Sequence, residues 1–329
     1  MRLLARIGFL LGVAATISLI AGSGAASILA LLLRAGWWLP WLVPLHVLPL
    51  LLDVTGWRTL IAAPTRPLRL FGIAAIREAV NRLLPVANIG GEVIGAHLLA
   101  RQGVAGPAAA ASIVVETMLT LVSQYLFAAL GLLCLLGLTG QTPFVSRAFL
   151  SFALSLPVIV AFALLLRHGA IFGRIEHAAA RMFAALSKGS LPFGNWALLD
   201  EAIGSLFEAP HRLALTVFWQ LLGLLAGCAE TWLVLRWVGH PVPVSAALAL
   251  ESLTQAVRSI FFVVPSGLGI QEAGLIGLGS LLGIQADVAL SLSLAKRLRE
   301  ILFGLPALGL WPRLEARRPA LPLGDRPQL

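Results

Sequence analysis

Apolar runs long enough to cross a bilayer recur along this sequence, and they restrict its fold more than any other feature does. A transmembrane helix needs about 20 predominantly apolar residues. The runs expected to span fully are 7–33, 37–63, 108–138, 148–166, 213–238 and 286–311. Because 59% of the residues are hydrophobic and only 12% are charged, the chain falls among polytopic membrane proteins. The sequence therefore predicts an all-α polytopic membrane protein with about six full transmembrane helices.

Residues 251–283 do not read as a simple spanning helix, because Pro265, Gly267 and Gly269 interrupt an apolar run. Proline removes an amide donor and glycine permits backbone angles that other residues avoid. One helix should therefore end before Pro265 and a second should begin near Gln271. Irregular backbone survives at membrane depth only where protein or a water-filled cavity surrounds it. The stretch predicts a re-entrant helical hairpin with a site at its tip.

The stretch 85–103 repeats this pattern, with a proline, paired glycines and a glutamate. Pro85 and Glu92 precede Pro265 and Glu272 by the same 180 positions. Transporters with inverted repeats and broken helices keep such weak internal symmetry in their sequences. We therefore expect a single membrane domain over residues 1–329, built from two repeat units that cover approximately 37–138 and 213–311.

The distribution of positive charge predicts how the chain is oriented. Most Lys and Arg residues lie in the N-terminus, in 58–101, in 167–212 and in the short tail 313–329. Cytoplasmic loops carry an excess of these residues, so both termini are expected in the cytoplasm. The two hairpins then enter from opposite sides, which makes the repeat inverted. The polar interval 168–211 is expected to be a cytoplasmic amphipathic insert. The stretch 64–84, in which apolar residues alternate with arginines at helical spacing, is expected to be an amphipathic helix lying at or entering the basic side of the membrane.

A charged cluster in the middle of the last run is the sharpest functional signal. It consists of Lys296, Arg297, Arg299 and Glu300, which share one side of a helix. A cation at mid-depth costs roughly 2.5–3.5 kcal/mol on insertion scales, so the cluster should face a polar cavity. If Glu300 neutralises Lys296, two positive charges remain. These suit a phosphate or another anionic headgroup, which arginine can grip with two parallel hydrogen bonds.

Intramembrane carboxylates allow a different interpretation of these cations. Buried charges usually have partners, and Glu116, Glu230 or Glu272 could complete a structural ion-pair network. Glu116 and Glu230 are also candidate proton carriers, together with Asp53, because ionisable residues within membrane helices are costly and usually functional. Glu92 and Glu272 lie at the hairpin tips, where each either caps the following helix or contacts ligand. Both roles stay open for these two glutamates.

Two more residues are predicted to bind ligand. Arg258 shares one face of its helix with Gln255 and Glu251, at spacings of three and four, and could line the same cavity. The alternative is that this face only packs against another helix. Asn88, in the first hairpin, completes the set of ligand-binding candidates.

Catalytic and metal-binding signatures are missing from the sequence. It has no nucleophile elbow, no phosphate-binding glycine loop and no His/Cys metal pattern, so no catalytic residue, metal or cofactor is expected. The net charge of +9 lies in clusters between apolar runs. That placement indicates anionic lipid at the membrane surface rather than nucleic acid. Cys134 and Cys228 lie inside apolar runs and are expected to be small buried hydrophobes.

Three segments carry a resemblance to a known family: VNRLLPVANIGGEVIGAHLL at 80–99, QAVRSIFFVVPSGLGIQEAG at 255–274 and LAKRLREILFGLPALGLW at 294–311. They resemble the flippase-like family related to the transmembrane part of lysylphosphatidylglycerol synthase, and within it the branch associated with hopanoid biosynthesis. The resemblance implies a multi-pass protein of the bacterial inner membrane, grouped with lipid translocases. The sequence shows no soluble aminoacyl-transfer domain, so synthase activity does not carry over.

The leading functional hypothesis is a lipid translocator, not an enzyme, whose cavity receives a polar or anionic headgroup. Its expected partners are membrane lipids, either a hopanoid or an anionic phospholipid, and hopanoid-biosynthesis enzymes. A lipid-modifying enzyme is the first alternative. A non-catalytic partner that organises hopanoid biosynthesis is the second.

Overall fold

The computed structural model describes residue 14 and residues 16–84, 90–140, 143–168, 196–261 and 264–316, and all elements in these ranges are helical. The first half contains α2 (Ala25–Ala35), the 3₁₀ helix η1 (Gly36–Trp41), α3 (Leu42–Leu60), α4 (Pro67–Leu83), α5 (Gly90–Arg101), α6 (Gly106–Thr139) and α7 (Pro143–His168). The second half contains α9 (Trp196–Phe207), α10 (Pro210–Trp237), α11 (Val244–Ile260), the 3₁₀ helix η2 (Pro265–Gly267), α12 (Ile270–Leu281) and α13 (Ala286–Glu315).

Three stretches in the described ranges are long and apolar enough to cross a membrane. They are Ala25–Leu60, which joins α2, η1 and α3, then Gly106–Thr139 and Pro210–Trp237. The apolar runs predict separate spans over 7–33 and 37–63, and the first of these lies partly outside the described residues. The count of six full spans therefore stays a prediction, while the membrane character and the all-helical class are clear.

The chain breaks where Pro265 and the neighbouring glycines predicted a break. Helix α11 ends at Ile260 and α12 begins at Ile270. Between them, Ser266, Gly267 and Gly269 all have positive φ, at 57°, 58° and 77°. A right-handed helix cannot continue through consecutive residues in this region, so the two limbs are separate helices.

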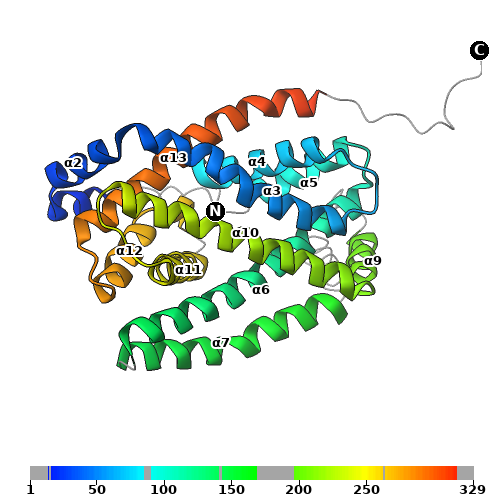
Figure 1. Cartoon of the computed structure of the whole chain (residues 1–329). Helices are drawn as coiled ribbons and strands as arrows, with labels where there is room; N and C mark the ends of the chain where they lie inside the picture. Colours follow the sequence, from blue (N-terminus) through cyan, green and yellow to red (C-terminus); the bar gives the residue numbers. More distant parts are fainter. Residues whose placement is uncertain are drawn as a thin grey trace, which may run out of the picture.

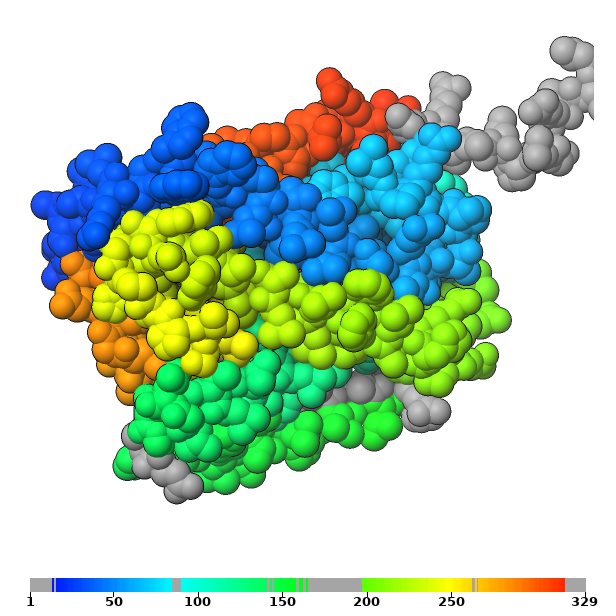
Figure 2. Space-filling view, in the orientation of Figure 1, coloured from blue at the N-terminus to red at the C-terminus, as the bar shows by residue number. Residues whose placement is uncertain are grey.

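Helix bounds and packing correspond between the two halves of the chain. Helices α5 and α12 have 12 residues each and begin 180 positions apart, and α6 and α13 begin at the same offset. Helix α4 packs against α13, whereas α11 packs against α6, and α3 packs against α10 (Figure 1). In the space-filling view α10 forms a layer between α3 and α6 (Figure 2). The orientation of the halves across a membrane stays a prediction.

A layer of polar residues separates two clusters of buried apolar residues. Helices α6 and α13 each contribute residues to both clusters. Near its start α6 contributes Ile113 to the cluster around α3, α4 and α5, and near its end it contributes Leu135 to the cluster around α10, α11 and α12. Helix α13 passes in the other direction, from Leu292 to Ala307. The polar residues of both helices lie between these points, so the layer that they form is enclosed by apolar packing on both sides.

Helix α4 is buried, although its arginines suggested an amphipathic helix at the membrane surface. Ile73, Ile76 and Val80 have no exposed surface, and Arg77 is only 8% exposed. The helix packs against α3, α5 and α13. Arginine is tolerated here because Arg77 is paired with carboxylates of α5 and α6, which the spacing of residues along α4 could not reveal.

Only part of the predicted insert 168–211 can be compared with the structure, because residues 169–195 lie outside the described ranges. Its second half forms α9, and Ile203 of α9 is buried in an apolar cluster with residues of α6. Helix α9 therefore packs onto the body of the protein along one face.

Candidate functional site

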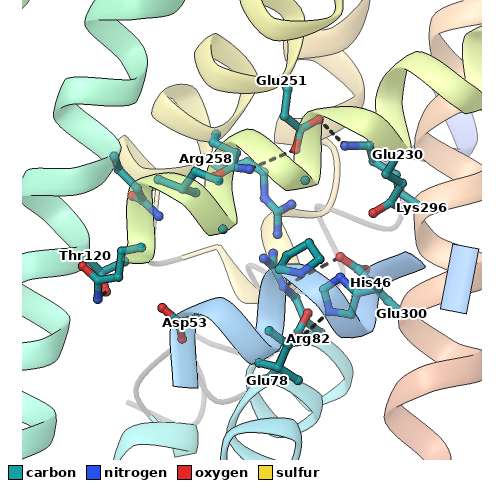
Figure 3. A pocket seen from close by; sticks show the side chains of 18 of the residues that line it. His46, Asp53, Glu78, Arg82, Thr120, Glu230, Glu251, Arg258, Lys296 and Glu300 are labelled. Atoms are coloured by element: carbon teal, nitrogen blue, oxygen red, sulfur yellow. Dashed lines mark hydrogen bonds and ion pairs between the residues drawn. The ribbon is translucent and has the colours of Figure 1, made fainter. Parts of the chain in front are cut away.

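A polar pocket of about 240 Å³ lies within the layer between the two apolar clusters. It is lined from α3, α4, α6, α10, α11 and α13 by His46, Pro49, Leu50, Asp53, Glu78, Arg82, Thr120, Ser123, Gln124, Gln220, Gly223, Leu224, Gly227, Glu230, Glu251, Gln255, Arg258, Lys296, Arg299 and Glu300. Figure 3 shows these side chains converging from several helices. The pocket therefore gathers charges that are far apart in the sequence.

Lys296 forms one wall of the pocket with a carboxylate of α11. Its ammonium group donates to Glu251, and the Thr231 hydroxyl of α10 donates to the same carboxylate oxygen. Gln255 donates to the other oxygen at 2.9 Å. Glu251 is thus held by three donors. It neutralises Lys296, for which the spacing along the helix predicted Glu300 as the partner. Residue spacing along a helix can identify only partners on that helix. Here the partner of Lys296 on α13 lies on α11.

Arg299 connects two further helices to α13. It contacts Glu230 of α10 at 3.1 Å and Glu78 of α4 at 3.4 Å. Glu78 also contacts the Nε2 atom of His46 on α3 at 2.8 Å. All of these side chains are mostly buried, and a buried cation is stable only with such partners.

Arg297 points to the broken helix rather than into the pocket. It donates to the carbonyl oxygen of Ser266 at 2.7 Å and contacts Glu300 at 3.2 Å and Glu272 at 3.4 Å. Glu300 lies in turn 3.7 Å from Arg82 of α4. Arg297 thus fixes the loop between α11 and α12, and it is not one of the described lining residues.

Glu272 caps α12. Its carboxylate accepts a hydrogen bond of 2.8 Å from the backbone amide of Gly269, and it also accepts one of 2.7 Å from Ser293 of α13. A carboxylate at this position satisfies a free amide and offsets the positive end of the helix dipole. The cap and the contact with Arg297 occur together, and Glu272 is fully buried away from the pocket.

Glu92 and Glu116 belong to a second charged cluster, around Arg77. Arg77 donates to the carboxylates of Glu92 and Glu116, and its distance to Glu116 is 2.6 Å. Its guanidinium also lies 4.8 Å from the ring centre of Trp57. Asn81 binds Glu92 and accepts from the amide of Gly91 at 2.8 Å. This cluster joins α4, α5 and α6 and does not line the pocket as described.

Asp53 and Arg258 are pocket residues that take part in none of these ion pairs. In the described part of the chain neither belongs to any of the salt bridges, and Arg258 donates only to the neutral side chain of Gln271, at 2.6 Å. Both side chains are partly buried and line the pocket. Figure 3 draws Asp53 apart from the group formed by His46, Glu78 and its neighbours.

Neutral polar side chains complete the pocket on the side of α6 and α10. Gln220 of α10 accepts a hydrogen bond of 2.9 Å from Ser123 and donates one of 2.8 Å to Thr120. Gln124 accepts from Ser259 of α11 at 2.6 Å. This side of the pocket offers hydroxyl and amide groups to a ligand without adding charge.

The predicted site residues fall into three groups. The structure brings together in one pocket Asp53, Glu230, Arg258, Lys296, Arg299 and Glu300. It places in the surrounding contacts Glu92, Glu116, Glu272 and Arg297. Asn88 lies outside the described residues. Within the described ranges, no group of His, Cys, Asp and Glu side chains is placed to hold a metal ion.

Sequence reasoning missed the contribution of α4 to the pocket and, on α3, that of His46. Glu78 and Arg82 lie in the stretch 64–84 that was predicted to be an amphipathic helix at the membrane, and His46 was not among the predicted site residues. The internal repeat held a usable signal, because α4 and α11 occupy corresponding places before the two short helices α5 and α12. The offset of 180 positions between the halves relates Arg258, on the side of α11 that faces the pocket, to Glu78 of α4. The repeat could therefore have indicated that this part of α4 also faces the pocket.

Comparison with known proteins identifies a family of membrane proteins. The family model described as the lysylphosphatidylglycerol synthase TM region matches residues 5–307. Searches of curated proteins and of solved structures gave no match. The family match covers most of the 329 residues, including the helices that line the pocket. The chain is a membrane protein and belongs to the lysylphosphatidylglycerol synthase TM-region family.

Proposed function

We propose that this protein moves a membrane lipid between leaflets and holds the lipid headgroup in the polar pocket during transfer. The observation that carries the proposal is a pocket rich in ionisable residues, enclosed between two apolar clusters of a membrane protein. Ionisable side chains inside a membrane are costly and usually mark a substrate pathway. Membership of a lipid-related family supports a lipid as the substrate.

The size of the pocket favours a headgroup over a whole lipid. Pockets that enclose a drug-sized ligand have volumes of roughly 300–1,000 Å³. This pocket has about 240 Å³, so the acyl chains or the ring system of a bound lipid must remain outside it. That division suits a protein that shields only the polar part of its substrate from the hydrocarbon. A hopanoid or a phospholipid would meet this requirement.

Each half of the chain packs its helix before the short helix against a long helix of the other half, α4 against α13 and α11 against α6. This arrangement supports a mechanism in which the pocket opens alternately to the two sides of the membrane. In the proposed arrangement the units 37–138 and 213–311 form an inverted repeat, with hairpins that enter the bacterial inner membrane from opposite sides and with both termini in the cytoplasm. Binding sites of such transporters lie between the repeats, near broken helices. Helices of both units line the pocket, and α11, which ends at the break, is one of them.

Filling the pocket without changing its charge tests this proposal. Gly227 lines the pocket and has open space where a side chain would begin, so Gly227→Leu should fit the fold and occupy the headgroup volume. Gly137 is also helical with open space around it, but it is exposed on α6 and lies outside the pocket. Gly137→Leu is therefore the matched control.

Vesicles that contain the purified protein and acyl-chain-labelled lipids provide the measurement. Dithionite bleaches only label in the outer leaflet, so the extent of bleaching reports lipid exchange. We expect exchange with the native protein and with Gly137→Leu, and its loss with Gly227→Leu. Exchange that Gly227→Leu leaves intact, or none with the native protein, would contradict the proposal. A change in lipid mass on incubation would indicate an enzyme instead.

A further inference from the structure

Most charged side chains that line the pocket are already neutralised. Lys296 is paired with Glu251, and Arg299 is paired with Glu230 and Glu78. A bound anion would compete with these carboxylates for the same cations. Leaving one partner of a buried ion pair without the other is strongly destabilising, so these paired cations are poorly placed to receive the charge of a ligand.

Two pocket charges of opposite sign remain available. Asp53 of α3 and Arg258 of α11 take no part in the salt bridges of the described residues. Arg258 uses one Nη1 donor on Gln271, and a guanidinium has five N–H donors in total. Enough donors remain for two parallel hydrogen bonds to a phosphate group.

We propose that the pocket selects a zwitterionic headgroup, with an ammonium group at Asp53 and a phosphate group at Arg258. This inference rests on the proposed function and names its substrate class. The two residues come from different helices, α3 and α11, and both line the same pocket. The hydroxyl and amide groups of Thr120, Gln124 and Gln220 would solvate the ester oxygens between the two charges.

Charge balance separates this class from simpler headgroups. A purely anionic headgroup would pair with Arg258 and leave Asp53 facing a negative ligand. A purely cationic headgroup would pair with Asp53 and leave Arg258 unmatched. Each unmatched charge that is closed off from water costs free energy. A zwitterion leaves neither charge unmatched, so it alone among the three classes satisfies both residues.

Binding of short-chain lipids to the purified full-length protein in detergent tests this selectivity. Isothermal titration would compare dihexanoyl-phosphatidylethanolamine, which carries both charges, with dihexanoyl-phosphatidylglycerol, which carries only the phosphate. We expect the native protein to bind the ethanolamine lipid about tenfold more tightly or better, since a charged hydrogen bond distinguishes the two. Equal affinities for the two lipids would overturn the inference.

Substitutions then assign each charge to its residue. Asp53→Asn should lower the affinity for the ethanolamine lipid about tenfold, and it should leave the affinity for the glycerol lipid unchanged or higher. Arg258→Gln should lower the affinities for both lipids by similar factors. Asp53→Glu keeps the charge and should keep the preference, which guards against a folding defect in the asparagine variant. If Asp53→Asn lowers the affinities for both lipids equally, Asp53 does not bind the ammonium group.

Control variants change the same kinds of charge outside the pocket. Glu201 on α9 and Arg147 on α7 are exposed, so Glu201→Gln and Arg147→Gln should leave both affinities as they are. The assay measures binding and not transfer, which separates the two proposals. Selective binding of the ethanolamine lipid without lipid exchange in vesicles would overturn only the proposal that the protein is a translocator. Exchange without any discrimination between the two lipids would overturn only the zwitterion site.

Discussion

Lys296 of α13 and Glu251 of α11 form a buried ion pair across one wall of the pocket. Thr231 of α10 donates to the same carboxylate, so the pair joins three helices at one point. Glu251 is 7% exposed and Lys296 is 8% exposed. A carboxylate and an ammonium group are stable at this depth only together, which makes the pair a requirement for closing these helices around the pocket.

Removing one member of this pair should destabilise the protein strongly. In Lys296→Met the carboxylate of Glu251 remains buried without its cation, and we expect a loss of about 3–5 kcal/mol in the free energy of unfolding. The double variant Lys296→Met, Glu251→Gln removes both charges and should recover much of that loss. Denaturation in mixed micelles measures all of these values.

The matched control for this prediction is Arg147→Met, which removes an exposed cation from α7. Its free energy of unfolding should stay within about 0.5 kcal/mol of the native value, as is usual for surface substitutions. If the double variant is as unstable as Lys296→Met, the loss comes from packing of the lysine chain, and the ion pair is not what holds the helices.

Gly91 allows α5 to lie close to the backbone of α4. A Cβ atom at this position would lie 2.3 Å from the carbonyl oxygen of Arg77 and 2.7 Å from Nδ2 of Asn81. Backbone cannot move aside as a flexible side chain can, so Gly91→Ala should cost about 1–3 kcal/mol or more through overpacking. The melting temperature of the purified protein in detergent reports this loss.

Gly277 provides a comparison within the corresponding helix α12. It has open space around its Cβ position, and alanine is the better helix former by about 0.5–1 kcal/mol. Gly277→Ala should therefore leave the melting temperature unchanged or slightly higher. Equal effects of the two substitutions would mean that α5 shifts away from α4 at little cost.

The sequence allowed the helix break and several pocket residues to be predicted, because their signals are local. Proline and glycine act on their own backbone, so the interruption at 265–269 could be placed from the residues alone. Charges inside an apolar run must face something polar, which identified Lys296 and Arg299. Both inferences need no knowledge of which helices are neighbours.

Partner identity could not be predicted in the same way. Arg77 and Glu78 are adjacent in the sequence, yet they contact carboxylates and cations from different helices and belong to different clusters. Spacing along α4 reports only which side of the helix each residue occupies. The identity of the facing helix depends on tertiary packing, and for this reason α4 was taken for a surface helix.

The orientation of the two halves predicts where reporter fusions will be active. The proposed arrangement places the end of α10 outside the cytoplasm and the tail after α13 inside. An alkaline phosphatase fusion after Gly239, beyond α10, should be active, whereas one after Arg318, in the tail, should be inactive. Activity of the Arg318 fusion would remove the inverted arrangement, whatever the pocket binds.

Ser266 links the broken helix to the other half of the protein. Its hydroxyl donates a hydrogen bond of 2.5 Å to the carbonyl oxygen of Arg82, near the end of α4, and its own carbonyl oxygen accepts from Arg297. The residue has left-handed backbone angles, with φ 57° and ψ 8°. A serine in this region is uncommon and costs roughly 1–2 kcal/mol, so the surrounding contacts must hold it there.

Ser266→Gly and Ser266→Val separate the backbone cost from the hydrogen bond. Glycine loses the hydroxyl contact but adopts these angles freely, so the two effects should nearly cancel in the free energy of unfolding. Valine loses the same contact and adopts left-handed angles poorly, and we expect it to be less stable than the glycine variant by at least about 1–2 kcal/mol. Denaturation in mixed micelles measures this difference. Equal stabilities would show that residue 266 is free to leave the left-handed region and that its contacts with Arg82 and Arg297 do not constrain the break between α11 and α12.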